Sequence, residues 1–436
     1  MLAPFRGLRY APDRVSGLAQ VTSPPYDAIG PGSVPRLLAA DPHNVVRLIL
    51  PHADPAAGAD GYAAAAGTLN SWVDEGVLAA DPRPAVYVYE QSTAAPGDVL
   101  QRGLIGAIRL SPPGAGIVLP HEAVMPGPVT GRRELMEATQ ANLEPIFLLY
   151  DGSPAGIRPA GPAAGERPGF ATCLVDEIAG ARAPLLTAVT EDGITHRLWA
   201  ATDQREQAAV AADLAPRQAL IADGHHRYAA YLELQARRRA AGDQGGPWDY
   251  GLALLVDSAA YPPRIGAMHR VIPGLPPAEA VALAKAAFTV RAMAGDLPAA
   301  LRELAEAGQD GPAFLIAGGG ELHLADHPDP VQVAAAMPAG RSPSWCALPA
   351  SVLAELLIGR LWRVPGGEDA VRVVHQDAAA ALRAADETGG TAVLCNPVSA
   401  VEVRDIAARG ERMPPKSTSF GPKARTGLLI RTFGYG

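Results

Sequence analysis

One stretch of the sequence decides how the rest is read: Leu220-Ile221-Ala222-Asp223-Gly224-His225-His226-Arg227-Tyr228. The apolar run over residues 218–222 predicts a buried strand, and the amphipathic run over 225–239 predicts a helix. Asp-Gly is a turn pair, and Asp223 is expected to be the N-cap residue of that helix. A helix start carries free N–H groups and the positive end of the helix dipole. Because Gly224 lets a bulky anion approach the backbone, this strand–glycine–helix corner predicts a phosphate site.

The three residues after the glycine add donors and positive charge to the corner. Cations in a first helical turn oppose the dipole, so His225, His226 and Arg227 break a local rule, which points to function. The alternative is a simple cap and turn, with one histidine filling a gap in the core. Adjacent helical residues point about 100° apart, so the two histidines cannot both be buried on one face.

Composition narrows the class of protein. The chain has 436 residues, 48% of them hydrophobic, which is typical of a globular protein with two or three domains. A net charge of −8 and the lack of a basic block beyond 237–239 argue against a nucleic-acid partner. Three cysteines far apart predict neither a disulfide framework nor a metal pair. Without a signal sequence or a long apolar run, we expect a cytoplasmic protein with no membrane partner.

Polar residues follow two proline-containing turns near the beginning of the chain, at 4–7 and 24–27. Arg6, Tyr26 and Asp27 lie at expected loop ends, where they suit a substrate cleft, although simple surface solvation is the alternative. Residues 34–40 predict a short helix, and 44–51 predict a strand.

A second polar motif, Pro120-His121-Glu122, comes between the predicted strands at 104–110 and 145–150. It precedes a basic helix start that contains Arg132, with the helix expected over 134–141. Glu122 is the preferred general base or metal carboxylate, and an exposed ion pair is the alternative.

The last third of the chain predicts alternating elements and a functional tail. Residues 152–169 predict a loop, 275–345 a small α/β lobe, and 427–432 a closing strand. The tail over 413–423 is stiffened by proline and glycine. Its polar residues can supply charges and donors to an anion, unless this is only a solvated loop: Lys416, Ser417, Thr418 and Lys423.

No Walker A loop, GxGxxG fingerprint, HExxH or GxSxG is present, so the common kinase, dehydrogenase, zincin and hydrolase assignments lose their usual support.

Four pieces together resemble the DUF1015 family from end to end: 4–7 with 24–27; 120–122 with Arg132 or Arg133; 222–228; and 413–418 with Phe420, Pro422 and Lys423. Ser419 or Gly421 stands where family members often carry an aromatic residue. The central corner alone resembles the ParB/sulfiredoxin superfamily, which includes free serine kinases. That resemblance implies that Gly224, His225, His226 and Arg227 hold nucleotide phosphates; sulfiredoxin's cysteine has no counterpart here.

The expected fold is α/β (α+β): a ParB/sulfiredoxin-like nucleotide-binding core with an inserted β-rich segment and a smaller α/β lobe. The expected regions are 1–151, with the His-Glu motif; 152–274, with the phosphate corner; 275–345, the small lobe; and 346–436, which returns the lysine-containing tail to the site.

Phosphoryl transfer needs a phosphate cradle, a divalent metal, positive charge and a base. The leading hypothesis is a kinase that uses ATP or ADP with Mg²⁺ and acts on a small hydroxyl metabolite. The superfamily resemblance implies free serine or a similar acceptor. The expected catalytic residues are Glu122, Asp223 and His226, with Glu122 and Asp223 as metal ligands. The expected substrate residues are Arg6, Tyr26, Asp27, His121 and Arg132, and the expected nucleotide residues are Gly224, His225, His226, Arg227, Lys416, Ser417, Thr418 and Lys423.

Two other functions stay open. A metal-dependent phosphoester hydrolase would use nitrogen and oxygen ligands from His121, Glu122, Asp223, His225 and His226. A non-catalytic ParB-like, nucleotide-gated binding protein is disfavoured by the acidic charge balance. The expected partners are the nucleotide and the small-molecule substrate, and the sequence is compatible with a homodimer.

Overall fold

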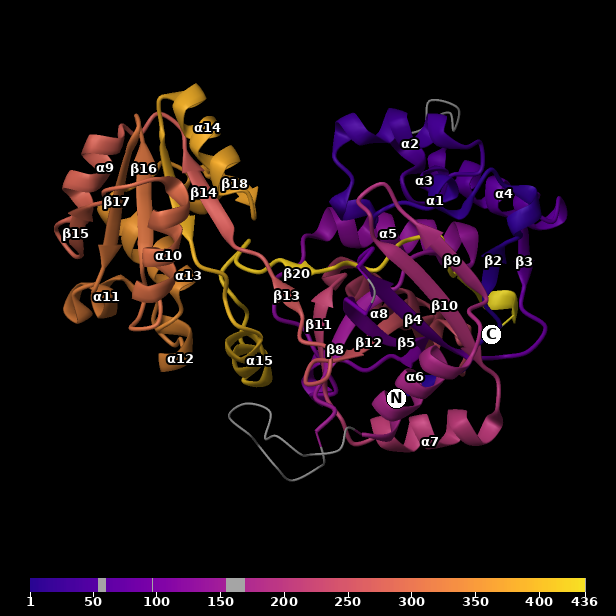
Figure 1. Ribbon diagram of the computed structural model, residues 1–436. Coiled ribbons are helices and arrows are strands. Elements are labelled where there is room, and N and C mark those ends of the chain that lie inside the picture. Colours follow the sequence, from indigo (N-terminus) through magenta and orange to yellow (C-terminus); the bar gives the residue numbers. More distant parts are fainter. Residues whose placement is uncertain (54–59, 96, 154–168, 436) are drawn as a thin grey trace. The chain divides into compact units, whose positions relative to one another are not determined.

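The computed structural model describes residues 1–53, 60–95, 97–153 and 169–435 (Figure 1). The expected loop over 152–169 therefore falls almost entirely outside the described residues. The chain forms two compact units. Unit 1 comprises Met1–Pro120, Val124–Pro263 and Pro422–Gly436, and unit 2 comprises His121–Ala123 and Arg264–Gly421.

Unit 1 is built around a mixed nine-stranded sheet. Its order is β6 (Val118–Leu119), β11 (Ala219–Asp223), β8 (Ile146–Tyr150), β12 (Tyr250–Asp257), β5 (Val99–Arg109), β4 (Val86–Ser92), β10 (Thr195–Ala201) and β9 (Leu186–Val189), with β1 (Leu2–Ala3) paired to β5. β11 runs parallel to β6 and β12 parallel to β8, while the other pairs are antiparallel. Every residue of β8 is buried, as its unbroken apolar sequence predicts.

Helices α6, α7 and α8 pack against one face of this sheet, where their apolar residues join strand residues such as Leu148, Ala253 and Leu255 in one buried cluster. The unit contains α1 (Leu18–Val21), α2 (Val34–Ala40), α3 (Val46–Ile49), α4 (Gly61–Asp74), α5 (Pro126–Thr139), α6 (Phe170–Ala181), α7 (Gln204–Leu214) and α8 (His225–Ala240). Two short strand pairs complete it: β2 (Leu8–Tyr10) with β3 (Leu78–Ala80), and β7 (Ala141–Asn142) with β21 (Arg431–Thr432). Helix α8 is fixed because Tyr228, Tyr231 and Leu234, at helical spacing, are buried in the core.

Some predicted elements differ from the observed ones. The predicted strand over 44–51 is wrong, because α3 occupies it. The Asn44 side chain accepts the Val46 N–H at 2.9 Å and donates to the carbonyl of Gln20 at 2.6 Å, and such side chain–backbone bonds favour a turn over a strand. Helix α5 begins at Pro126, earlier than expected, with proline in its first turn. The predicted closing strand is confined to β21.

Unit 2 is a six-stranded antiparallel sheet between two layers of helices. The order is β15 (Thr289–Ala292), β17 (Glu321–Asp326), β16 (Phe314–Gly318), β19 (Thr391–Cys395), β14 (Met268–Ile272) and β18 (Arg372–His375). Phe314 and Ile316 pack with helix α9 (Pro277–Ala284) and the π-helical segment Val352–Leu361. Leu315 and Ala317 pack on the opposite face, with α10 (Leu297–Ala307) and α14 (Ala378–Thr388).

The remaining elements of unit 2 are short: β13 (Arg264–Ile265) pairs with β20 (Phe420–Gly421), and the helices are α11 (Pro330–Ala336), α12 (Pro343–Cys346), α13 (Pro349–Ser351) and α15 (Ala400–Ala408). The prediction of a mixed α/β protein is confirmed. Within the part of the chain that the structure describes, no helix has both the length and the apolar character needed to cross a bilayer.

Candidate phosphate-binding site

The predicted strand–glycine–helix corner is present in unit 1. Strand β11 ends at Asp223, Gly224 adopts a left-handed conformation with φ +93°, and α8 begins at His225. The expectation that Asp223 caps the helix is wrong: Gly224 is the N-cap residue, and among the described residues no side chain caps this helix. The Asp223 carboxylate is instead occupied by Arg227 and Lys423. A helix start without a side-chain cap is a place where an anion can be held.

Gly224 is needed at the corner for two reasons. Its positive φ disfavours any residue with a side chain. In addition, a Cβ atom at this position would lie 2.9 Å from Cγ2 of Ile146 and 3.1 Å from Nε of Arg227. The backbone at the helix start is thus packed directly against the Arg227 guanidinium.

Two carboxylates and two cations from three remote segments meet beside this helix start, and we call them the ion cluster: Asp27, Asp223, Arg227 and Lys423. The Lys423 Nζ lies 2.5 Å from Asp223 Oδ1 and 3.2 Å from Asp27 Oδ1. Arg227 forms a short ion pair with Asp223, and its Nη2 lies 3.8 Å from Asp27 Oδ2. The formal charges of the cluster cancel.

The pKa values of Asp27, Arg227 and Lys423 in the ion cluster are all shifted in the direction that favours the charged form. Burial by itself would lower the pKa of Lys423, but Asp223 and Asp27 outweigh it, so the pKa is raised. Burial would raise the pKa of Asp27, but Arg227 and Lys423 outweigh it and lower that pKa. Burial would also lower the pKa of Arg227, but the carboxylates of Asp223, Glu144 and Asp27 outweigh it and raise that pKa.

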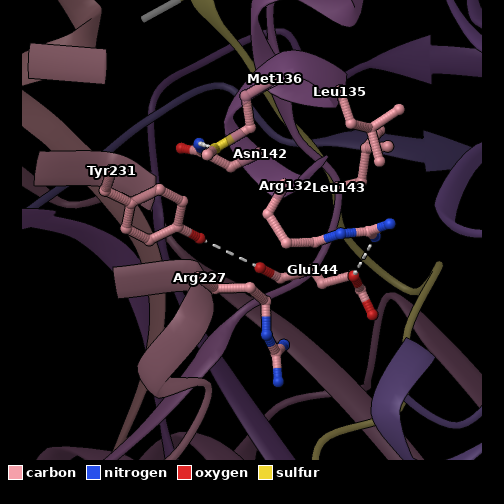
Figure 2. A pocket seen from close by; sticks show the side chains of 8 residues that line it. All are labelled: Arg132, Leu135, Met136, Asn142, Leu143, Glu144, Arg227 and Tyr231. Atoms are coloured by element: carbon pink, nitrogen blue, oxygen red, sulfur yellow. Dashed lines mark hydrogen bonds and ion pairs between the residues drawn. The ribbon is translucent and has the colours of Figure 1, made fainter. Parts of the chain in front are cut away.

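Arg227 also contributes to the wall of a small cavity of about 20 Å³ (Figure 2). The cavity is lined by Arg132, Leu135, Met136, Asn142, Leu143, Glu144, Arg227 and Tyr231. A water molecule needs about 10–15 Å³, so the cavity has room for one water and is far too small for a nucleotide. The Arg227 Nη1 donates to the carbonyl of Pro145 at 2.6 Å, while its buried Nε has no partner among the described residues.

Glu144 is a charged residue that the sequence analysis missed. It is 4% exposed, accepts the Tyr26 N–H at 2.9 Å, and lies 3.8 Å from Arg132 Nη1. Burial raises its pKa, against the opposing effect of Arg227 and Arg132. Its only signal in the sequence is an acidic residue directly before Pro145 and the apolar strand β8. Glu144 therefore holds the turn at Tyr26 in place through the hydrogen bond from the Tyr26 N–H.

Arg132, and not its neighbour Arg133, is the arginine that reaches the site. Its guanidinium lies 4.3 Å from the centre of the Tyr26 ring, a cation–π contact, and its Nη1 also donates to the carbonyl of Ile49 at 2.7 Å. Arg133 pairs with Glu137 at 2.7 Å on the same helix. Burial raises the pKa of Tyr26 to about 12, so the phenol stays neutral.

The two histidines of the corner have different surroundings, as the helical spacing predicts. His225 is buried, whereas His226 is partly exposed. The His226 Nε2 accepts the Met125 N–H at 3.1 Å, and burial lowers the pKa of this imidazole. A neutral ring that accepts on Nε2 carries its proton on Nδ1, so its second nitrogen is a donor.

The backbone at Lys423 is held by side chains that the sequence analysis also missed. On β4 and β5, Gln91 donates to the carbonyl of Lys423 at 3.1 Å, and Gln101 donates to that of Pro422 at 2.7 Å. Both glutamines are buried, and they bond to each other across the sheet. The sequence gives little signal for them, because Gln91 stands between Glu90 and Ser92 and Gln101 is followed by Arg102. The position of Lys423 is therefore set by the sheet.

A second polar group lies in unit 2 and joins two other predicted motifs. The Thr418 hydroxyl donates to Glu122 Oε1 at 2.7 Å and lies 3.0 Å from Nε2 of His121, which is fully buried. Arg270, also buried, donates to the carbonyl of Lys416 at 3.0 Å, where φ is +53°. Ser417 donates to the carbonyl of Pro414 at 2.7 Å, so these hydroxyls are already engaged.

The predicted site residues thus fall into two sets. Unit 1 brings Tyr26, Asp27, Arg132, Asp223, Gly224, His225, His226, Arg227 and Lys423 to the corner or its supporting layer, and unit 2 holds His121, Glu122, Lys416, Ser417 and Thr418. Arg6 belongs to unit 1, where its Nε donates to the carbonyl of Asp81 at 2.8 Å. That both sets serve one ligand stays a prediction, as does a metal shared by Glu122 and Asp223.

Glu144 offers a direct test of this charge arrangement. Its folded-state pKa is raised, so the stability it contributes is fully present below its unfolded pKa of about 4.3 and is lost as pH rises through the folded value. The free energy of unfolding of the native protein relative to Glu144→Gln should fall with pH over that window, by at most about 1.4 kcal/mol per pH unit, and then level off. Urea denaturation of both proteins between pH 4 and 8 measures it. A difference that stays flat or grows with pH would contradict the assignment.

The chain belongs to the DUF1015 family, because the family model described as "Protein of unknown function (DUF1015)" matches residues 2–348. No curated protein sequence matches it. Among solved structures it is distantly similar to a free serine kinase in complex with AMP, with 15% identity, a TM-score of 0.33, and coverage of 70% of this chain and 83% of the other.

Two further solved structures show the same level of similarity. SbnI with a C-terminal truncation from Staphylococcus aureus has 11% identity, a TM-score of 0.36, and coverage of 75% of this chain and 87% of the other. A conserved hypothetical protein from Pyrococcus furiosus has 13% identity, a TM-score of 0.32, and coverage of 70% and 87%. Similarity this distant carries no argument about function, which has to come from the site.

Proposed function

We propose that this protein is a nucleotide-dependent phosphotransferase that moves a phosphoryl group from ATP or ADP to the hydroxyl of a small metabolite, in the manner of a serine kinase. The observation that carries the proposal is the ion cluster itself. Segments around residues 27, 223–227 and 423 supply two cations and two carboxylates beside a helix start that no described side chain caps. Phosphoryl transfer depends on this combination of an anion cradle, positive charge and metal-binding oxygens.

The phosphates would bind where the first-turn N–H groups of α8 and the two cations converge. The Arg227 guanidinium and the Lys423 ammonium are charge-assisted donors, and the helix dipole favours an anion at this end. Since the cavity lined by Arg227 has room for only one water molecule, the nucleotide would lie at the solvent-exposed side of the helix start. There the Asp27 and Lys423 side chains are 32% and 31% exposed.

Asp27 and Asp223 fit a magnesium ion, because Mg²⁺ prefers carboxylate oxygens and is usually held by one or two of them together with substrate phosphates. When bound, the ion would neutralise charge on the transferring phosphoryl group. Asp223 is an expected metal ligand, whereas Asp27 was expected to bind substrate. Glu122, the other expected ligand, has Thr418 as a donor within unit 2.

The acceptor hydroxyl needs a proton acceptor close to the phosphates. The partly exposed Asp27 carboxylate, held ionised by Arg227 and Lys423, would orient that hydroxyl. His226, expected to be catalytic, would instead donate from Nδ1 to a phosphate oxygen, because its Nε2 is engaged by Met125. These roles make Asp27 the residue proposed to orient the acceptor hydroxyl and His226 a proposed phosphate ligand.

The test is an incubation with ATP or ADP, Mg²⁺ and a pool of amino acids and other hydroxyl metabolites, followed by phosphorus NMR and mass spectrometry. We expect a phosphorylated metabolite, with a loss in kcat of about 10²–10³-fold in Lys423→Met, because a donor to developing charge is removed. Lys285→Met is the matched control, since Lys285 is an exposed lysine of unit 2 and should leave the rate unchanged.

Other outcomes would replace the proposal. Nucleotide binding without any phosphorylated product would favour a nucleotide-gated binding protein. Release of inorganic phosphate from phosphoesters without an acceptor would favour a hydrolase.

A further inference from the structure

The ion cluster is neutral, and its four charged groups pair with one another. Lys423 Nζ lies between the two carboxylates, 3.2 Å from an oxygen of Asp27 and 2.5 Å from an oxygen of Asp223. A divalent ion held by both aspartates would need the same oxygens. A phosphate would need the same two cations, Lys423 and Arg227. Either ligand by itself can therefore reach these charged groups only by displacing a partner that they already have.

We propose that Lys423 is an exchangeable counter-ion that occupies the metal position until a polyphosphate arrives, so that the divalent cation and the polyphosphate bind only together. This inference rests on the proposed function and specifies its ligand as the metal–polyphosphate complex. On binding, Asp27 and Asp223 would hold the metal in place of Lys423, and the released Lys423 ammonium would pair with the phosphates. The carboxylates would then have the metal as a partner in place of Lys423, and Lys423 would have the phosphates in place of the carboxylates.

The physical reason is the cost of leaving charges without a partner. Removing one member of a buried ion pair is strongly unfavourable, because the other stays desolvated and uncompensated. A metal ion that binds alone displaces Lys423 and crowds positive charge against Arg227, whose side chain is only 5% exposed. A polyphosphate that binds alone draws the cations away from Asp27 and Asp223. Bound together, the two ligands satisfy all four groups.

Lys423 is the member of the cluster that is able to move. Arg227 is buried and held by the carbonyl of Pro145, so its guanidinium stays in place. The Lys423 side chain is long and 31% exposed, while its backbone is fixed by Gln91 and Gln101. The exchange therefore needs only a change in the Lys423 side chain.

The first test measures binding of Mn²⁺, as a spectroscopic substitute for Mg²⁺, with and without ADP. In the native protein, ADP should tighten Mn²⁺ binding about 10- to 100-fold, a usual range for coupled sites. In Lys423→Met the aspartates are released, so Mn²⁺ alone should bind about 10-fold more tightly than to the native protein, and the coupling should shrink toward one. Lys285→Met should behave like the native protein. Unchanged or weaker Mn²⁺ binding in Lys423→Met would overturn the proposal.

A second measurement uses the native protein, so it does not depend on the folding of a variant. The chain has only three lysines, Lys285, Lys416 and Lys423, so the ammonium resonances can be assigned in a ¹⁵N-lysine sample. The Lys423 resonance should shift when Mg²⁺ and ADP are added together and stay in place with either alone. A shift with Mg²⁺ alone, equal to that with both, would refute the exchange.

The two proposals fail in different ways. If ADP binds to no form of the protein, the proposed function fails, while tighter Mn²⁺ binding in Lys423→Met would still show that Lys423 competes for the metal position. If ADP binds but its binding is independent of Mn²⁺, the exchange fails and nucleotide binding stands.

Discussion

Replacing Arg227 with methionine should destabilise the protein by about 3–5 kcal/mol, the usual cost of removing one partner from a buried ion pair. The Arg227 side chain is 5% exposed and pairs with Asp223, and the buried Glu144 also raises the pKa of this guanidinium. Methionine fills a similar volume but leaves both carboxylates without this cation. Urea denaturation at pH 7 gives the free energy of unfolding of each protein.

Arg237→Met is the matched control, on the same helix. Arg237 is 62% exposed and pairs with Glu137 at 3.3 Å, so its removal should change stability by no more than about 1 kcal/mol. If Arg227→Met costs no more than this control, the cluster is not the buried, interdependent network described above.

Gly224→Ala should combine a loss of stability with a loss of nucleotide binding. A non-glycine residue in the left-handed region costs about 1–2 kcal/mol, and the new Cβ would also lie 2.9 Å from Ile146 and 3.1 Å from the Arg227 Nε. Relief of these contacts requires a shift of Ile146, of the helix start or of the guanidinium, and a shift of either of the last two disturbs a phosphate donor. We expect nucleotide affinity to fall at least about tenfold, equal to about 1.4 kcal/mol, as measured by calorimetry.

Gly242→Ala separates the two effects, because Gly242 follows the other end of α8. Its φ is +98°, close to that of Gly224, but apart from its two chain neighbours no described residue has an atom within 4 Å of an added Cβ. This variant should show the conformational cost alone, with nucleotide binding unchanged. Equal binding losses in both variants would mean that the corner has no special part in holding phosphate.

The local part of the site could be predicted from the sequence. An apolar run, a glycine and an amphipathic run are short-range signals, and they correctly predicted β11, the turn at Gly224 and α8. The strand predicted over 44–51 failed because hydrophobic content alone does not distinguish a short buried helix from a strand. The side-chain bonds of Asn44, which decide between them, depend on the Gln20 carbonyl far along the chain.

The contacts of the site that join residues far apart in the sequence could be expected only through family resemblance. Lys423 is 200 residues from Asp223 in sequence, and nothing local indicates that they pair. Asp223 resembles an N-cap residue in sequence, but in the fold it pairs with Arg227 and Lys423, and that tertiary context overrides the capping preference. Glu144, Gln91 and Gln101 act through burial and through carbonyl groups, which leave almost no trace in the sequence.

A crystal structure of the protein with ADP and Mg²⁺ tests the central claim most directly. The account predicts phosphate oxygens within hydrogen-bond distance of the N–H groups of residues 225–227 and of the Arg227 and Lys423 side chains, with the metal on Asp27 and Asp223. Phosphates bound elsewhere on the chain, with Lys423 still paired to both aspartates, would contradict it.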